Sequence, residues 1–367
     1  MIHRTRSPLR ISFAGGGTDV PPYPQKRGGV VLSATIDKFT YASLAPQDST
    51  EVSVHSLDYD VTVRYNHNET LKYDGELDLV KAVINKFHPP QGFHLFLHSD
   101  VPPGSGLGSS SSLMVALSSL MFRWLGRNAD EYALARTAYE LERIELGIKG
   151  GIQDQYAAAF GGFNFIEFSG DDVIVNPLRI RPDTLDELQY HLLLCYTGAT
   201  RLSSGIIETQ VKAYVQEEKV VMDALDELKQ ITIQMKNCLL KGYLGDFGDL
   251  LHAGWVNKKK LAAQITNPTI DEMYEVARHA GALGGKLLGA GGGGYLLLYC
   301  PYLRKHLIAE AVTRLGAQVA GFMFEPRGVT GWSVEEGVSE PARGTGCAAR
   351  EEVASGLDNG IGKKVTG

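Results

Sequence analysis

The spacing of hydrophobic and polar positions predicts a chain in which strands and helices are mixed. In the first 150 residues, stretches in which apolar and polar residues alternate predict strands over 9–14, 29–36, 39–46, 51–56, 60–65 and 93–98. Apolar residues at helical spacing predict helices over 77–87, 109–125 and 130–147. Asp130 is a suitable N-cap for the third helix, and Gly147 is a suitable stop.

Longer helices dominate the second half of the chain. Strands are predicted over 163–168, 173–175 and 191–195, with Pro177 and Pro182 at a boundary before the last of them. Amphipathic helices are predicted over 204–241 (in one piece or two), 243–264 and 269–281. The pattern then predicts a strand, a glycine-rich turn, a second strand, a helix over 302–315 and a strand over 317–324.

The length of 367 residues is enough for two domains. We expect a first domain over residues 1–182 and a second over 183–333. From Val334 onward bulky apolar residues become scarce, which predicts a peripheral or disordered tail over 334–367.

Residues 102–113, Pro-Pro-Gly-Ser-Gly-Leu-Gly-Ser-Ser-Ser-Ser-Leu, form a glycine- and serine-rich turn that leads directly into the second predicted helix. Its three glycines allow tight bends and close approach to a ligand. The unpaired N–H groups and the positive end of the helix dipole favour a phosphate there, and the serine hydroxyls can add hydrogen bonds or a Mg²⁺ ligand. The Walker A and Gly-x-Gly-x-x-Gly patterns are both absent. A plain strand-to-helix connection is the competing interpretation.

Two further glycine-rich segments strengthen the prediction of a ligand pocket. Residues 7–19, Ser-Pro-Leu-Arg-Ile-Ser-Phe-Ala-Gly-Gly-Gly-Thr-Asp, predict a strand that ends in glycines and delivers Asp19 to a polar pocket, or else a simple hairpin turn. Residues 284–299 contain four consecutive glycines before an apolar strand. Such a run is costly in conformational entropy, so we expect close approach to a ligand or to another loop; a flexible hinge is the alternative.

These three segments, in this order and spacing, resemble the GHMP family of small-molecule kinases. The middle segment matches the family's Pro-x-Gly-x-Gly-Leu-Gly-Ser-Ser ATP loop, and the resemblance extends from about Pro8 to Phe324. It implies a two-domain α+β fold, in which an N-terminal domain like ribosomal protein S5 and a C-terminal ferredoxin-like domain enclose the active site. ATP, Mg²⁺ and a small-molecule acceptor are the implied ligands.

Within the family, residues 8–19 and 150–162 look most like the sugar kinases that phosphorylate D-glycero-D-manno-heptose 7-phosphate at the anomeric oxygen. The implied product is the 1,7-bisphosphate, an intermediate on the way to activated heptose for bacterial surface glycans. A kinase for another sugar, such as fucose or galactose, is an alternative. A sensor that binds ATP and sugar without turnover is another, although the acidic residues at 142 and 154 favour an enzyme.

The resemblance also implies roles for individual residues. Asp154 corresponds to the catalytic aspartate, with a helix N-cap as its alternative role, and Arg10 to a basic residue beside the transferred phosphoryl group. Glu142 and Ser110 correspond to Mg²⁺ ligands, although Glu142 would also suit the polar face of an amphipathic helix. The ATP loop would comprise Pro103, Gly104, Ser105, Gly106, Leu107, Gly108, Ser109, Ser110 and Ser111, and the third motif Gly289, Gly291, Gly292 and Gly293.

The acceptor sugar would contact Gly16, Gly17, Thr18 and Asp19. Glycines stand at 15–17 where galactokinases have bulkier polar residues, which favours a sugar larger than galactose. Arg201 follows a turn after the strand 191–195, and an arginine there could bind a sugar phosphate through two parallel hydrogen bonds.

The net charge of −6 argues against nucleic acid as a partner, so a kinase with two anionic substrates must gather positive charge locally. The candidates are Arg10, Lys26, Arg27, Lys149, Arg201, Lys258, Lys259 and Lys260. No apolar run is long enough to cross a membrane, no secretory signal is recognisable, and four well-separated cysteines predict neither a disulfide framework nor a zinc site. We therefore expect a cytoplasmic protein, monomeric or homodimeric.

Overall fold

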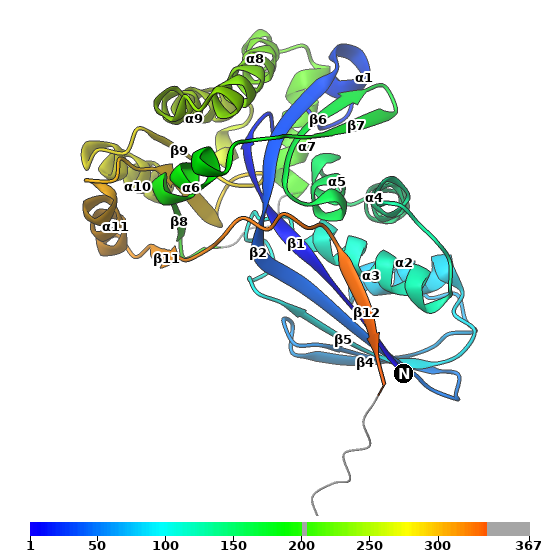
Figure 1. Ribbon diagram of the computed structural model, residues 1–367. Coiled ribbons are helices and arrows are strands. Elements are labelled where there is room, and N and C mark those ends of the chain that lie inside the picture. The colour runs from blue at the N-terminus through cyan, green and yellow to red at the C-terminus, as the bar shows by residue number, and fades with distance from the viewer. Residues whose placement is uncertain (200–203, 336–367) are drawn as a thin grey trace, which may run out of the picture. The chain divides into compact units, whose positions relative to one another are not determined.

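The N-terminal half of the protein is built around two long antiparallel strands, β1 (Ile2–Ala14) and β2 (Gly29–Pro46), as Figure 1 shows. The computed structural model describes residues 1–199 and 204–335, and residues 1–334 form one compact unit. β1 begins before the predicted strand 9–14, and β2 joins the two strands predicted over 29–36 and 39–46. The prediction broke β2 at Asp37 and Lys38, which form a β-bulge opposite Pro8 and Leu9.

The larger sheet has the order β12-β1-β2-β5-β3-β4, and β6 also pairs with the start of β2, with β7 beyond it. Only β3 and β5 pair in parallel among these neighbours. The strands other than β1 and β2 are β3 (Glu51–Ser56), β4 (Val61–Asn66), β5 (Phe93–Ser99), β6 (Phe163–Ser169), β7 (Asp172–Pro177) and β12 (Thr330–Val334). β12, which the sequence pattern did not predict, brings the end of the described chain back to the first strand.

Two helices from the first half, α3 (Ser109–Trp124) and α5 (Gln153–Phe160), pack against β1 and β2 of this sheet. α2 (Asp78–Phe87) and α4 (Glu131–Tyr139) pack against α3, and the short α1 (Tyr23–Arg27) contacts β6. Asp130 caps α4 as predicted, because its carboxylate accepts the N–H of Ala133 at 2.7 Å. The helix predicted over 130–147 is not uniform, however. After Tyr139 it widens into a π-helix (Glu140–Glu145), a turn that the apolar spacing does not specify.

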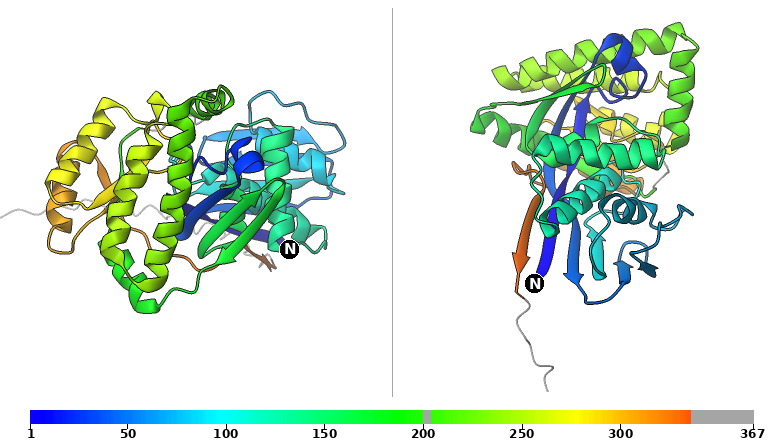
Figure 2. Two further views of the ribbon diagram at one scale, coloured as in Figure 1. Left: turned by 90° about the horizontal axis from the view of Figure 1, so that it is seen from above. Right: turned by 90° about the vertical axis from the view of Figure 1, so that its right-hand side faces the viewer.

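The second half contains a smaller antiparallel sheet of order β11-β8-β10-β9 covered by helices. Its strands are β8 (Leu192–Tyr196), β9 (Gly284–Leu287), β10 (Tyr295–Tyr299) and β11 (Gln318–Ala320). Its helices are α6 (Pro182–His191), α7 (Ser204–Val215), α8 (Lys219–Lys241), α9 (Leu244–Lys258), a 3₁₀ turn (Ala263–Ile265), α10 (Pro268–His279) and α11 (Lys305–Arg314). In Figure 2, α8 and α9 lie side by side in lime and yellow-green.

The segment predicted as helical over 204–241, in one piece or two, forms two helices, α7 and α8, separated by the polar residues 216–218. Other predictions in this half were wrong, and α6 was not predicted. The helix predicted over 243–264 ends at Lys258, and the strand predicted over 317–324 is reduced to β11.

A shared core connects the two halves. Leu9, Ile11 and Phe13 of β1 are buried in one cluster with Met235 of α8 and Phe247 of α9. Because side chains alternate along a strand, Arg10 and Ser12 face the other side of β1, where a cavity lies. The strand therefore carries core on one face and candidate chemistry on the other. The division at 182/183 coincides with the start of α6 and stays a prediction.

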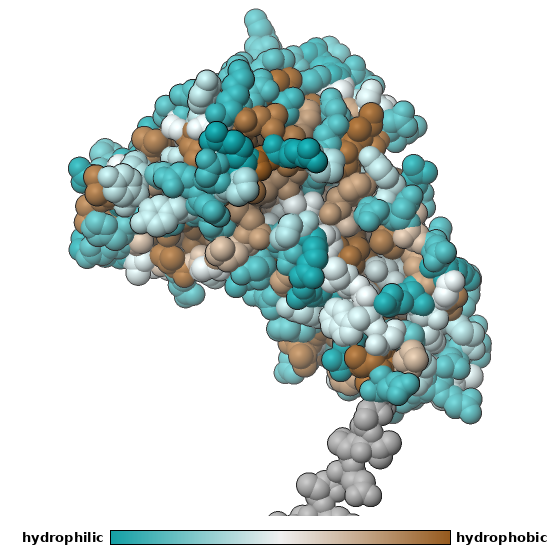
Figure 3. Space-filling model, in the orientation of Figure 1, coloured by the Kyte–Doolittle hydropathy of each residue, from teal (hydrophilic) through white to brown (hydrophobic). Residues whose placement is uncertain are grey.

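The surface in Figure 3 is mainly hydrophilic, with hydrophobic side chains in separate patches. Within the described residues, no helix combines the length and the apolar character that a membrane span requires.

Candidate active site

A cavity of about 750 Å³ brings the three glycine-rich segments together. Its walls come from both halves of the chain, because β1, α3, the π-helix and α5 meet α7, α9 and β9 there. The predicted residues that line it are Arg10, Gly16, Gly17, Asp19, Pro103, Gly104, Gly106, Gly108, Ser109, Ser110, Ser111, Glu142, Lys149, Asp154, Lys258, Gly289, Gly291 and Gly293. Residues separated by almost 300 positions in the sequence thus share one space.

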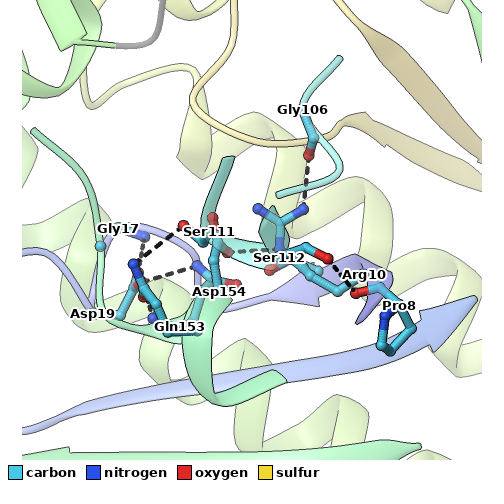
Figure 4. Close-up of polar contacts among 12 residues, drawn as sticks. Pro8, Arg10, Gly17, Asp19, Gly106, Ser111, Ser112, Gln153 and Asp154 are labelled. Carbon is cyan, nitrogen blue, oxygen red and sulfur yellow. Dashed lines mark hydrogen bonds and ion pairs between the residues drawn. The ribbon is translucent and has the colours of Figure 1, made fainter. Parts of the chain in front are cut away.

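Asp154 and Arg10 form an ion pair in this cavity. Arg10 Nε donates to Asp154 Oδ1 at 2.7 Å, and Arg10 Nη1 donates to the carbonyl oxygen of Gly106, also at 2.7 Å. Figure 4 shows the guanidinium between the carboxylate and the glycine loop. Asp154 lies in the first turn of α5, after the N-cap Ile152, so its alternative role as an N-cap is wrong. Its second carboxylate oxygen is left to act on a ligand.

The start of α3 forms the adjacent wall. Gly108 is the N-cap in a left-handed conformation (φ 77°), and an added Cβ would lie 3.5 Å from both Arg10 and Asp154. Ser109, Ser110 and Ser111 form the first turn and line the cavity. The first N–H groups of a helix have no partner within the helix, so this turn presents backbone donors beside the Arg10–Asp154 pair. Such a turn can bind an anion.

Glu142 is fully buried behind this turn, so its alternative role on a solvent-facing helix surface is wrong. Ser110 Oγ donates to Glu142 Oε1 at 2.8 Å, and Ser111 Oγ donates to Oε2 at 2.7 Å. Gln155 Nε2 donates to Oε2 at 2.6 Å, and Arg143 Nη1 lies 3.2 Å from Oε1. The charge of this carboxylate is therefore paired and hydrogen-bonded, as burial requires.

The oxygen atoms at this end of the cavity fit a magnesium ion. Mg²⁺ prefers one or two protein oxygens together with phosphates and water, and Ser110 Oγ and Glu142 Oε1 are adjacent at the anion-binding turn. In residues 1–199 and 204–335, no cluster of three or more His, Cys, Asp or Glu side chains is arranged to hold a metal. A metal bound here would therefore take most of its ligands from phosphates and water.

On another part of the cavity wall, Asp19 is fully buried. Asp19 Oδ1 accepts the N–H of Gly17 at 3.0 Å, and Oδ2 accepts the backbone N–H and the Nε2 of Gln153 at 3.2 and 3.0 Å. A Cβ added to Gly151 would lie only 1.9 Å from Asp19 Oδ2, which explains the glycine at that position. The carboxylate is thus held in place and retains capacity to accept hydrogen bonds from a ligand.

The third glycine-rich motif packs against the glycine- and serine-rich loop 102–112, backbone against backbone. A Cβ at Gly106 would lie 2.5 Å from the carbonyl oxygen of Leu288, and one at Gly294 would lie 2.2 Å from that of Ser105. Tyr295 N donates to Ser105 O at 3.0 Å. The expected close approach of this motif to another loop is therefore observed. Its glycines are needed because side chains would collide with the facing backbone.

Four residues assigned to ligand binding do not line the cavity. Thr18 Oγ1 donates to the carbonyl oxygens of Gly15 and Val30 at 2.8 and 2.9 Å, so it holds the turn rather than a ligand. Ser105 and Leu107 are fully buried, and Gly292 N donates to Ile265 O at 2.9 Å. Arg201 lies outside the described residues.

The candidate basic residues separate into two groups. Lys26 lies over the ring of Tyr214, Arg27 pairs with Asp226, Lys259 pairs with Asp271, and Lys260 is exposed and donates to Asn257. These four do not line the cavity, so their prediction as substrate-binding charges was wrong.

Lys258 is buried and lines the cavity together with Lys286, which the sequence analysis did not select. Burial, assisted by the nearby positive charge of Arg10, lowers the pKa of Lys258 to about 8. Burial, with the charges of Lys258 and Arg10, lowers the pKa of Lys286 to about 7. Asp19 opposes both shifts.

Sequence reasoning also missed Ser12, Gln153 and Gln155. The two glutamines occupy the segment that carries Asp154, but amides have no distinctive spacing. A lysine in the apolar stretch before the third glycine-rich turn was the signal that could have identified Lys286.

Comparisons with known proteins agree with this arrangement. Residues 77–162 match the model for the GHMP kinases N terminal domain, and residues 235–318 match the model for the GHMP kinases C terminal domain. A D-glycero-alpha-D-manno-heptose 7-phosphate kinase from Campylobacter jejuni is 38% identical over 337 residues, which cover 90% of this chain and 99% of that protein.

Solved structures of sugar kinases are also similar to this chain. A crystal structure of a D-glycero-D-manno-heptose 1-phosphate kinase from Bacteroides thetaiotaomicron is 35% identical, with a TM-score of 0.77 over 91% of this chain and 100% of the other. A galactokinase from Lactococcus lactis, solved with galactose, shares the fold at 22% identity, with a TM-score of 0.74 over 90% of this chain and 95% of that one. With both halves matched and a relative covered almost from end to end, this chain belongs to the GHMP kinase family.

Proposed function

We propose that the protein transfers the γ-phosphoryl group of ATP to the anomeric hydroxyl of D-glycero-D-manno-heptose 7-phosphate and so makes the 1,7-bisphosphate. The observation that carries the proposal is the Arg10–Asp154 ion pair, which lies between an anion-binding helix start and a buried carboxylate suited to sugar hydroxyls. The similarity to the heptose 7-phosphate kinase supports the choice of substrate.

Asp154 acts on the acceptor hydroxyl. In the proposed reaction its free carboxylate oxygen accepts the proton while the hydroxyl oxygen bonds to the γ-phosphorus and the bond to the β-phosphate oxygen breaks, releasing ADP. Phosphoryl transfer depends mainly on positioning and charge stabilisation. Arg10, held by Gly106 and Asp154, places a positive charge where negative charge develops.

At the nucleotide end, the first turn of α3 would bind the phosphates of ATP through its backbone N–H groups. Ser110 and Glu142 would hold Mg²⁺, which neutralises phosphate charge when it is bound. Asp19 and Gln153 would orient the sugar ring. We place the enzyme in the cytoplasm, as a monomer or a homodimer.

The proposal is tested by measuring ADP release with the purified protein, Mg·ATP and a panel of acceptors: heptose 7-phosphate, unphosphorylated heptose, fucose, galactose and mannose. We expect the highest kcat/KM with heptose 7-phosphate, and ³¹P NMR of the product should show a new phosphate coupled to the anomeric proton.

Two outcomes would overturn the proposal. Preferred turnover of fucose or galactose would assign the protein to another sugar. Binding of nucleotide and heptose 7-phosphate with no turnover of any acceptor would make it a sensor.

A further inference from the structure

Three polar groups surround the space left by the missing side chain of Gly16, and a fourth lies beside Ser12. A Cβ placed on Gly16 would lie 3.5 Å from Gln153 Nε2, 3.6 Å from Ser12 Oγ and 4.0 Å from Lys258 Nζ. The fourth group is Lys286, whose Nζ donates to the carbonyl oxygen of Ser12 at 2.8 Å. The groups come from β1, α5, α9 and β9, and all four residues line the cavity.

The two lysines carry more positive charge than their surroundings compensate. Lys258 Nζ donates to Gly16 O at 2.9 Å and Lys286 Nζ to Ser12 O, and both acceptors are neutral carbonyls. An ammonium has three donors, so each retains hydrogen-bonding capacity. Asp154 is paired with Arg10, which leaves Asp19 as the carboxylate that acts on both lysines. Buried charge without a counter-ion is unfavourable, and an anionic ligand would supply the counter-ion.

Two buried oxygen atoms at the same place also lack a partner within the described residues. Ser12 Oγ and Gln153 Oε1 are inaccessible to solvent and accept or donate no hydrogen bond there, although both side chains line the cavity. Buried polar atoms are nearly always hydrogen-bonded. A ligand that offers both anionic oxygens and hydroxyl groups would satisfy the lysines, the serine and the amide together.

We propose that Lys258 and Lys286, with Ser12, bind the phosphate that the acceptor sugar already carries at the end remote from the reacting hydroxyl. The inference rests on the proposed function, because that function requires an acceptor with a phosphate of its own. The absence of a side chain at Gly16 leaves room for it in the cavity that Asp19 also lines. In the proposed function the phosphates of ATP bind elsewhere, at Gly108–Ser111.

The test compares three substitutions, Lys258→Met, Lys286→Met and, as a matched control, Lys260→Met. Lys260 is two residues from Lys258 but is exposed and does not line the cavity. Hydrogen bonds to charged groups contribute about 1.5–3 kcal/mol, which corresponds to roughly 10–100-fold in affinity. We therefore expect Lys258→Met and Lys286→Met each to raise KM for heptose 7-phosphate by at least about tenfold. KM for ATP, and the kcat/KM or competitive inhibition constant of unphosphorylated heptose, should change less than about twofold, and Lys260→Met should resemble the wild type.

Contrary results separate the alternatives. Equal losses with phosphorylated and unphosphorylated heptose would mean that the lysines only support the turn at Gly16. A raised KM for ATP would assign them to the nucleotide, and a loss in kcat alone would assign them to the transferred group; each result would overturn the inference. If the wild type turns over heptose 7-phosphate and the lysine variants do so with unchanged KM, the inference fails while the proposed function stands. A wild type inactive on heptose 7-phosphate defeats the proposed function itself.

Gly16→Ala provides an independent measurement that leaves the lysines in place. The added Cβ would make contacts of 3.5–4.0 Å, which are ordinary van der Waals distances, so the variant should fold. It would occupy the space assigned to the phosphate. We expect a higher KM for heptose 7-phosphate, with thermal unfolding unchanged; an unchanged KM would place the phosphate elsewhere.

Discussion

The part of the cavity that we assign to the nucleotide and the part that we assign to the sugar are built in different ways; we call them the nucleotide end and the sugar end. The nucleotide end depends on one continuous segment, residues 102–112, whose glycines and serines lead into α3. The sugar end combines Ser12 and Asp19 with Gln153, Lys258 and Lys286, which come from distant parts of the chain. A site made of adjacent residues has a sequence pattern, whereas a site made by tertiary packing has none until the chain is folded.

Charge is also arranged differently at the two ends. Glu142 at the nucleotide end has Arg143, two serines and Gln155 as partners, so its pairing is complete within the protein. The lysines at the sugar end donate to neutral carbonyls and share Asp19. We infer that the nucleotide end is preorganised, and that the sugar end completes its pairing when the substrate binds.

The largest expected effect lies between the two ends, at Asp154. Asp154→Asn removes the proton acceptor while it preserves the size of the side chain, and general base catalysis contributes about 10²–10⁴-fold to a rate. We expect kcat to fall by about 10³-fold, with KM for ATP and for the sugar phosphate both near the wild-type values, as steady-state kinetics would show. Near-normal kcat would remove Asp154 from the base role. A large rise in KM for only one of the two substrates would instead mean that Asp154 binds that substrate.

A smaller effect is expected at the nucleotide end, from Ser110→Ala. The substitution removes a proposed Mg²⁺ ligand and the 2.8 Å hydrogen bond to Glu142, which Ser111 and Gln155 continue to hold. We expect KM for Mg·ATP to rise by about tenfold, the lower end of the range for a charged hydrogen bond. KM for the sugar phosphate should not change, because Ser110 is not among the residues that we assign to the sugar.

Ser109→Ala is the comparison for this variant, since Ser109 occupies the same first turn but is not among the residues that bond to Glu142. Its KM for Mg·ATP should rise less than that of Ser110→Ala. Equal effects of the two substitutions on KM for Mg·ATP would mean that Ser110 contributes no more to binding of Mg·ATP than Ser109 does.

The fold could be predicted where local patterns control it. The start of α3 at Ser109, the bounds of β3 and the N-cap Asp130 follow from alternation, helical spacing and capping chemistry. The continuity of β2 across its bulge, the π-helix that carries Glu142 and the return of β12 to β1 depend on neighbours that are remote in sequence. Local spacing therefore could not specify them.

The same distinction applies to the site. Arg10, Asp19, Ser110, Glu142 and Asp154 were selected through the resemblance of their motifs, and the structure brings all five to one cavity. Thr18 was also selected, but its hydroxyl bonds to backbone carbonyls of Gly15 and Val30 and does not line the cavity. Ser12 was missed because one serine in an apolar strand has no signature. Lys286 does stand out in its apolar stretch, but its connection to the site arises only where β1 and β9 meet.

The smallest expected effect concerns how stability depends on pH, and it tests whether Lys286 at the sugar end lacks a counter-ion in the free enzyme. The pKa of Lys286 is lowered from 10.5 to about 7 by burial and by the charges of Lys258 and Arg10, while Asp19 acts in the opposite direction. Between those two pH values the unfolded chain binds more protons at this lysine than the folded chain. The free energy of unfolding must therefore rise with pH in that window, by about 1 kcal/mol from pH 7 to pH 8.

Lys286→Met should abolish this increment, and the difference between the two proteins removes the contribution of titrating groups that do not interact with Lys286. Lys258 does interact with it and titrates in the same range. Urea unfolding at pH 7.0, 7.5 and 8.0 measures the difference in the free energy of unfolding. This pH range avoids the Cys195 and Cys300 thiols, because it lies below their ordinary pKa. Burial raises the pKa of both thiols, so they lower stability only at higher pH. Parallel profiles for the wild type and Lys286→Met would mean that the lysine is already compensated in the free enzyme. The contrast between a preorganised nucleotide end and a sugar end that awaits its anion would then be lost, because both ends would have complete charge pairing before the substrate arrives.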